Sequence, residues 1–475
     1  MNTPLLLTRP ALFTLDQLQQ IEVAALRLLE EVGIAVLSDE LTRRLQGRGF
    51  RWRGNRVLLE GQVVGEFLRS VREANGNQFV PEPDVPAGLD SPLHLNTICY
   101  SQYVHDLDSD RVVPYTAARL IEATKLVYVA GAEHLTRTVP GCPQDTPADL
   151  QIILQSWIDA TYCGSGFYGD VHTRRSLPYL MAIAQVFGKT IAGQVVYTVT
   201  PLAIGSEGLE NVFAYQDQWQ WVGVGNMASL GVTTPLRVAD AFALLAAEVI
   251  GAAFLVREAT GLAAHFSLRV CPADLRTLFL TLGTPEDLLL QLANAEVNAF
   301  FHGTRWSPGL SGVHTMAKLP GAQACAEKAS AMTMGALLGA RHFGLAGTLS
   351  LDEVFSPEQL IYDLEIRNHV QRLVTGLDLA DCDPERCVAE AHEALAGHGY
   401  LSLDSTLDHY RETYWHPRLF ERDLLMAWQR GGSTTIREKA QARVREMIAQ
   451  HDFHLPDDQQ RAMDDILRRA REALG

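Results

Sequence analysis

Alternation between short apolar runs and longer helical stretches constrains this chain more than any other feature. From about residue 116, strands are predicted near 134–140, 161–167, 190–198, 220–225, 263–268, 296–301, 342–347 and 398–402. Helices are predicted between most of them, at 116–130, 146–159, 174–187, 206–217, 235–258, 285–294, 321–340 and 357–375. Eight strands with interleaved helices favour a (β/α)8 TIM barrel over a doubly wound sheet.

The segments before and after this alternation have other patterns. Residues 15–32 have one apolar face and are predicted to form a helix, and Gly54 and Asn55 are predicted to turn a hairpin. The end of the chain is rich in Arg and Glu, which is typical of a helix with a solvated face. We therefore predict three parts: a mixed α/β appendage over 1–115, the barrel over 116–404 and a C-terminal helical extension over 405–475.

Charge and cysteine content exclude several classes of protein. The net charge of −16 disfavours nucleic acid and anionic membrane surfaces as partners. The seven cysteines are scattered and odd in number, so a disulfide framework is not expected and a reducing cytoplasm fits. The most apolar stretch, 241–256, is short for a bilayer and contains Glu248, so we predict a buried helix. The N-terminus does not have the pattern of a signal peptide.

Two glycine patterns match the dinucleotide-binding spacing without its structural context. One begins at Gly164 and the other at Gly223. A dinucleotide site needs a helix to open directly after the pattern, whereas Pro178 and Pro235 delay the predicted helices. No His-x-Cys pair of the kind found in zinc-dependent methyl-transferring barrels occurs, and we expect no metal site.

Several separated motifs carry a family resemblance over nearly the whole chain. They are VHDLDSDRVVPYTAARL (104–120), NMASLGVTTP (226–235), TMAKLPGAQACAEKA (315–329), LDEVFSPEQLIYDLEIRNHVQRLVTGL (351–377) and HGYLSLDSTLDHYRETYWHPRLFER (398–422). The chain resembles the trimethylamine methyltransferase family of corrinoid-dependent TIM-barrel enzymes. It contains no nonstandard residue and so is similar to the branch without pyrrolysine, which acts on quaternary amines such as glycine betaine.

The resemblance implies a methyltransferase that moves a methyl group from a quaternary or tertiary methylamine, such as a betaine, to the Co(I) of a corrinoid protein. The cobalamin would be supplied by that partner. A quaternary ammonium releases a neutral amine, so the reaction needs neither protonation nor a metal Lewis acid, and the protein must orient the substrate and exclude water. Two alternatives stay open: a barrel that binds a betaine or corrinoid without turnover, and a barrel enzyme of unrelated chemistry. A homo-oligomer is also left open.

In a barrel the chemistry is expected at the C-terminal ends of the strands. The predicted substrate-binding residues are Phe167, Tyr168, Asp170, Tyr197, Asn226, Phe301, His302, Arg305 and Trp306. The aromatic side chains would attract a methylated cation, although each could instead pack in the core. The Arg305 guanidinium would bind a substrate carboxylate, or could instead lie at the rim of the site.

The loop before the helix predicted at 321–340 supplies the remaining candidates. His314 is the predicted catalytic residue, and Gly312, Thr315 and Lys318 are predicted to contact the corrinoid. Met316 and Gly321 stand where the family usually has Asp, which marks this loop as unusual for the family.

Overall fold

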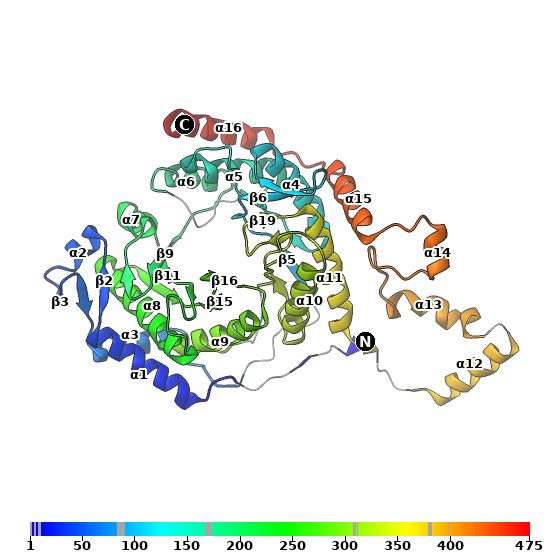
Figure 1. The fold of residues 1–475 in the computed structure, drawn as a ribbon, viewed down its shortest axis with the longest axis horizontal. Coiled ribbons are helices and arrows are strands. Elements are labelled where there is room, and N and C mark those ends of the chain that lie inside the picture. The colour runs from blue at the N-terminus through cyan, green and yellow to red at the C-terminus, as the bar shows by residue number, and fades with distance from the viewer. Residues whose placement is uncertain are drawn as a thin grey trace.

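The chain forms a mixed α/β fold in a computed structural model that describes residues 2–3, 6–7, 11–82, 91–166, 173–306, 310, 312–378, 382–397 and 399–475 (Figure 1). The helices are α1 (Leu15–Glu31), α2 (Asp39–Leu45), α3 (Gly61–Ala74), α4 (Ala117–Ala130), α5 (Ala148–Cys163), α6 (Leu177–Val186), α7 (Glu207–Ala214), α8 (Val238–Thr260), α9 (Pro285–His302), α10 (Ala322–Leu337), α11 (Pro357–Thr375), α12 (Pro384–Ala396), α13 (Asp404–Thr413), α14 (Leu425–Arg430), α15 (Ile436–Ala449) and α16 (Asp457–Leu474). The predicted α/β class is confirmed.

The strands are short. They are β1 (Asn2–Thr3), β2 (Ile34–Val36), β3 (Arg51–Arg53), β4 (Arg56–Leu58), β5 (His94–Asn96), β6 (Tyr103–Asp106), β7 (Arg111–Pro114), β8 (Leu135–Thr136), β9 (Gly193–Val199), β10 (Ala203–Ile204), β11 (Trp221–Gly225), β12 (Ala228–Ser229), β13 (Ala263–Ser267), β14 (Val270–Cys271), β15 (Ala273–Asp274), β16 (Phe279–Leu280), β17 (His342–Phe343), β18 (Thr348–Leu349), β19 (Val354–Phe355) and β20 (Leu377–Asp378).

Two of the sheets contain the parallel strands that matter for the site. One has the order β13-β11-β9-β10-β2-β4-β3, in which β9, β11 and β13 run parallel. The other has the order β17-β5-β8 and is parallel throughout. The hairpin predicted around Gly54 is present as the antiparallel pair β3 and β4. Strands from the first 115 residues thus share sheets with strands from the predicted barrel.

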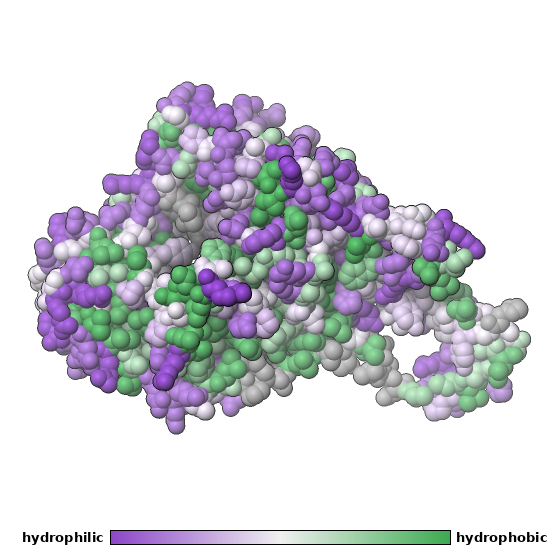
Figure 2. Space-filling view, in the orientation of Figure 1, coloured by the Kyte–Doolittle hydropathy of each residue, from purple (hydrophilic) through white to green (hydrophobic). Residues whose placement is uncertain are grey.

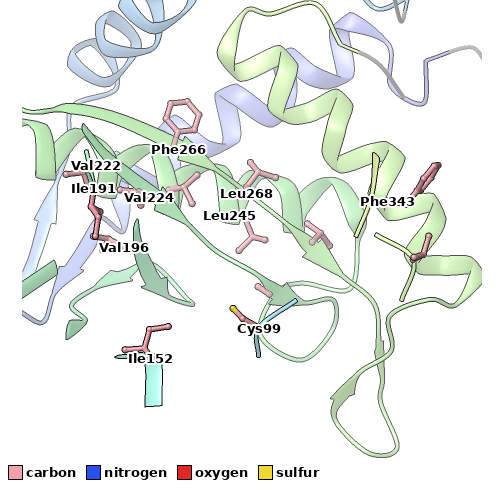
Figure 3. Packing of buried hydrophobic residues seen from close by; sticks show 14 of the residues in the cluster. Cys99, Ile152, Ile191, Val196, Val222, Val224, Leu245, Phe266, Leu268 and Phe343 are labelled. Atoms are coloured by element: carbon pink, nitrogen blue, oxygen red, sulfur yellow. The ribbon is translucent and has the colours of Figure 1, made fainter. Parts of the chain in front are cut away.

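One part of the hydrophobic core lies between the first of these sheets and the long helix α8. Val222 and Val224 of β11 lie beside Val196 of β9, and Leu245 of α8 lies on the same side (Figure 3). Helix α1 packs along α8, where Phe13 meets Phe242 with ring centroids 5.8 Å apart. This packing explains why α8 is apolar on nearly every side.

Helix α8 has the length and apolarity of a membrane span, and it is the one helix of the described ranges that does. Of its most apolar window, 78% is buried inside the protein. The prediction of a buried core helix at 241–256 is confirmed.

Three predicted strands are wrong. Helix α5 continues to Cys163, so the strand expected at 161–167 begins as helix. Helix α9 continues to His302 and takes up all of 296–301. A 3-10 turn, Tyr400–Ser402, occupies the position of the last strand. The reason is the same for the first two: a short, fully buried apolar run has the same composition in a strand and in a buried helix.

The C-terminal helices lie on the outside of the fold, as predicted for the charged tail. Helix α15 packs on α4 and α11, and α16 packs on α5 and α6 (Figure 1). Arg443 of α15 bonds Glu133 at 3.0 Å, and Trp157 of α5 donates its indole N–H to Asp464 of α16.

Candidate active-site cleft

A cleft of about 1010 Å³ opens at the C-terminal ends of the parallel strands. Tyr197 and Thr198 come from β9, Asn226 and Met227 follow β11, and the segment 267–269 ends and follows β13. The rest of the lining comes from Asn96, Ile98, Tyr100, Leu280, Leu282, Gln291, Asn294, Ala295, Asn298, Gly312, His314, His342, Gly344, Leu345, Leu351 and Asp352. The cleft thus lies at the end of the strands where the chemistry of a barrel is expected, and we take it as the candidate site.

One wall of the cleft is built by a helix that hydrogen-bonds to a strand. Asn294 bonds both backbone groups of Val270 at 2.9 Å, and Asn298 bonds both of Leu268, at 3.0 and 2.9 Å. His302 Nε2 lies 2.7 Å from the Phe266 carbonyl and must carry its proton, because a carbonyl only accepts. Four residues of a helix span about 6 Å along its axis, and two residues of a strand span about 6.6 Å. Because these lengths are nearly equal, side chains four residues apart on α9 can each bond to every second residue of the neighbouring extended segment. We call Asn294, Asn298 and His302 the α9 ladder.

Arg269 lies between the two residues that the Asn side chains hold. Leu268 and Val270 are buried, whereas Arg269 between them is half-buried and lines the cleft. Its own backbone N–H donates to Asn226 Oδ1 at 3.3 Å. Burial raises the pKa of Asp287, and the nearby positive charge of Arg269 opposes this rise. The cleft wall therefore holds a partly buried guanidinium close to the buried carboxyl of Asp287.

A buried carboxylate holds the ends of β9 and β11 beside the cleft. Glu248 of α8 accepts hydrogen bonds from the hydroxyls of Thr198 and Thr200, from the Leu202 N–H at 2.6 Å and from the Asn226 amide at 3.1 Å. The Asn226 amide also donates to the Leu245 carbonyl. Both polar ends of Asn226 are thus engaged by the protein, and this residue links the β9 and β11 ends to α8.

His314 is the buried imidazole of the cleft. Burial, helped by the positive charges of Arg269 and Lys328, lowers its pKa to about 3, so the ring is neutral at pH 7. Its Nδ1 lies 3.8 Å from Asp287 Oδ2 and has no hydrogen-bond partner. Burial raises the pKa of Asp287, whose Oδ2 accepts from the Gly283 N–H and from Gln291.

Two glycines make room for this imidazole. A side chain at Gly312 would come within 2.6 Å of the His314 ring, and one at Gly283 within 2.4 Å of the His314 carbonyl. Gly283 also has φ +86°, a conformation that other residues rarely adopt. The Gln291 side chain bonds both the N–H and the carbonyl of Gly312. The loop holding His314 is therefore fixed by α9.

The structure brings four of the predicted site residues together and separates the others. Tyr197, Asn226, Gly312 and His314 line the cleft. Thr315 instead donates to Glu327, and Lys318 donates to Ser350 at 2.7 Å, so these two hold the neighbouring loop.

The residues predicted after a strand at 296–301 lie away from the cleft lining because that strand is a helix. Phe301 is fully buried against Phe300, and His302 belongs to the α9 ladder. Trp306 donates its indole N–H to the Val80 carbonyl, and Arg305 is exposed. Phe167, Tyr168 and Asp170 lie outside the described residues.

Sequence reasoning missed several residues of the cleft: Tyr100, Arg269, Gln291, Asn294, Asn298 and Asp352. It also missed Asp287, which lies beside His314. One signal was available, because Asn294, Asn298 and His302 recur every fourth residue along a helix. Such spacing puts them on one face. Over the described part of the chain, no group of three or more His, Cys, Asp or Glu side chains has a metal-binding arrangement.

Three comparisons show which known proteins this chain resembles. The family model described as trimethylamine methyltransferase matches residues 6–475. Glycine betaine methyltransferase of Desulfitobacterium hafniense is 26% identical over 468 residues, which cover 94% of each chain. Proline betaine:corrinoid methyltransferase of Eubacterium limosum is 25% identical over 91% of each chain. Among solved structures, monomethylamine methyltransferase of Methanosarcina barkeri aligns with a TM-score of 0.44 and 11% identity, over 99% of this chain and 90% of the other.

Proposed function

This chain belongs to the trimethylamine methyltransferase family, and on that premise we propose that it transfers a methyl group from a betaine to the Co(I) of a corrinoid protein. The N–CH3 bond breaks, the electron pair stays on nitrogen, and a neutral tertiary amine leaves. The corrinoid, supplied by the partner protein, provides the nucleophile that takes the methyl group. The relatives that cover nearly the whole chain are named for betaines, which supports a substrate of this class.

Arg269 carries the proposal. A betaine has a carboxylate as well as a methylated cation, and an arginine binds a carboxylate with two parallel hydrogen bonds. A partly buried guanidinium in the cleft wall, with water largely excluded around it, gains from a carboxylate that a ligand brings. The α9 ladder holds Leu268 and Val270 and so fixes the direction of Arg269. A rigid guanidinium at this place supports orientation of the substrate by its carboxylate.

The opposite end of a betaine needs an environment for a methylated cation. Tyr197 and Tyr100 line the cleft, and an aromatic face attracts such a cation by roughly 0.5–2 kcal/mol. The Asp352 carboxylate, also in the lining, adds a negative charge. We propose these three residues as the binding site of the ammonium group. Phe167, Tyr168 and Asp170 stay predictions, because they lie outside the described residues.

His314 remains our proposed catalytic residue in a positioning sense. A neutral imidazole adds no positive charge beside the methylated cation, whereas a protonated one would repel it. The leaving amine needs no proton, so a His with its pKa near 3 is suited to this reaction. The cleft volume is at the upper end for small-molecule sites, which supports entry of a second, larger group. Gly312, Thr315 and Lys318 stay our candidates for the face toward the corrinoid.

The fold also supports a barrel-type enzyme. We propose that β5, β8, β9, β11, β13 and β17 belong to one interrupted (β/α)8 ring. A bridge between Gly312 and Gly344 supports a further strand position beside β17. The α9 ladder covers the edge of β13 in place of a hydrogen-bonded strand. We also propose the division of the chain at about residues 115 and 404, except that β5 of the first part joins the ring. A cytoplasmic location is likewise a proposal.

The test is anaerobic incubation with Co(I) cobalamin and a substrate panel of glycine betaine, proline betaine, choline and trimethylamine, followed by methyl-cobalamin absorbance. We expect Arg269→Gln to raise the KM for the betaines by about 10- to 100-fold, as expected for a lost charged hydrogen bond, and to leave any choline turnover unchanged. Arg276→Gln is the matched control, because Arg276 is 89% exposed and pairs with Asp274. No methyl-cobalamin with any quaternary amine would refute the proposed function, and equal losses for betaine and choline would refute the role of Arg269.

A further inference from the structure

A pair of helices projects from the body of the protein and buries almost nothing. We call residues 382–397 and 399–414 the arm; it contains α12 and α13 and forms the lower right of Figure 1. In Figure 2 an opening separates the arm from the body. Of the arm's described side chains, only Ala394 and Leu403 are buried hydrophobic residues. The arm therefore has no core of its own.

Large apolar side chains are concentrated on the arm. Exposed ones are Val388, Leu395, Tyr400, Leu401, Leu407, Tyr410 and Tyr414, with Leu395 at 85% and Leu401 at 83%. Leu403, Leu407, Tyr410 and Tyr414 follow the spacing of one helix face, so α13 carries an apolar stripe. Large exposed apolar side chains gathered on one segment are typical of a surface that binds a partner. Helices of 13 and 10 residues are also marginal in water without tertiary packing.

The body offers a matching apolar surface at the base of the arm. Leu373 near the end of α11 and Leu377 of β20 are exposed, and we call them the root patch. Arg372 bonds the carbonyls of Gly376 and Thr413, so both ends of the arm are fixed to this place. In a two-fold symmetric dimer, each chain contributes the same surfaces to the interface. The arm of one chain can therefore cover the root patch of the other, and the reverse contact forms at the same time.

We propose that the arm covers the arm and root patch of a second copy of this chain, so that the protein is a symmetric dimer. Seven exposed aromatic and aliphatic side chains offer on the order of 800 Å² of surface, which is what each partner contributes to a stable interface of standard size. A second copy of the chain is present wherever the first one folds. It can therefore bury the apolar side chains of the arm at all times. In Figure 1 the arm lies at the lower right, whereas β9 and β11, whose ends line the cleft, lie left of centre.

Light scattering after size exclusion tests the dimer with the full chain. The wild type is expected at twice the chain mass of 52.4 kDa, and Val388→Glu combined with Leu401→Glu is expected at the mass of one chain. Leu377→Glu, on the other half of the interface, is expected to dissociate the dimer as well. Val23→Glu is the matched control, because Val23 and Val388 are both 58% exposed. A wild type that is monomeric throughout, or a dimer that survives both arm and root variants, overturns the proposal.

Hydrogen exchange adds a readout that does not depend on variants. On dilution to monomer, amide protection in α12 and α13 is expected to fall by at least tenfold while that in α11 stays unchanged. Arm protection that is independent of protein concentration would also overturn the proposal. Capture of the arm by an added corrinoid protein, with the wild type monomeric, would assign it to the other occupant. None of these outcomes depends on methyl transfer, so they are separable from failure of the proposed function.

Discussion

Replacement of Asn298 by Leu tests whether the α9 ladder holds the cleft wall. The side chain satisfies the N–H and the carbonyl of Leu268, a residue that is 1% exposed. Leaving two buried backbone groups without partners costs about 1–3 kcal/mol each. Leu is the better helix former by a few tenths of a kcal/mol, which offsets little of this. We expect Asn298→Leu to lower the free energy of unfolding by about 2–4 kcal/mol.

Urea unfolding followed by circular dichroism measures this change. Asn75→Leu is the control, because Asn75 also donates to a backbone carbonyl, that of His302, but at an exposed position. The control should cost less than about 1 kcal/mol. If the two variants shift the urea midpoint equally, the ladder is not holding the strand. In that case Asn298→Leu should also leave the KM for a betaine unchanged. If the ladder does hold the strand, Asn298→Leu should raise this KM, because the Arg269 side chain would no longer be held in position.

Two further changes test buried charge and the buried imidazole. Lys328→Met should destabilise the protein by about 3–5 kcal/mol, since it strands Asp363 in the core, and adding Asp363→Leu should recover part of the loss in the same urea assay; full stability of the single variant would contradict a buried ion pair. His314 has a folded pKa of about 3 against an ordinary 6.5, so the unfolded chain binds a proton that the folded one does not, and stability falls as the pH drops from 6.5 toward 3. His314→Gln should flatten this dependence by up to about 1.4 kcal/mol per pH unit in urea midpoints taken from pH 7 to 4; parallel curves for both proteins would show that the imidazole is not buried neutral.

The sequence determined those features that rest on local pattern or on the family motifs. The predicted helices at 116–130 and 357–375 agree with α4 and α11, because caps and apolar periodicity mark a helix locally. The strands near 220–225 and 263–268 agree with β11 and β13. Tyr197 was within reach because it lies at the end of a predicted strand, and Asn226 because it begins a family motif. Gly312 and His314 lie directly before the family motif at 315–329.

Tertiary structure alone decided what the apolar runs become and which polar groups meet. Residues 296–301 have the composition of a strand but form part of α9. Side chains of this helix, those of Asn294, Asn298 and His302, bond the backbone of Val270, Leu268 and Phe266, which an adjacent strand would otherwise do. The position of Arg269 depends on Asn294 and Asn298, which follow it by more than twenty residues, and no local pattern marks it as a residue of the cleft. The sequence identifies the family and most helices because these depend on near neighbours, whereas the cleft depends on hydrogen bonds between residues brought together only by folding.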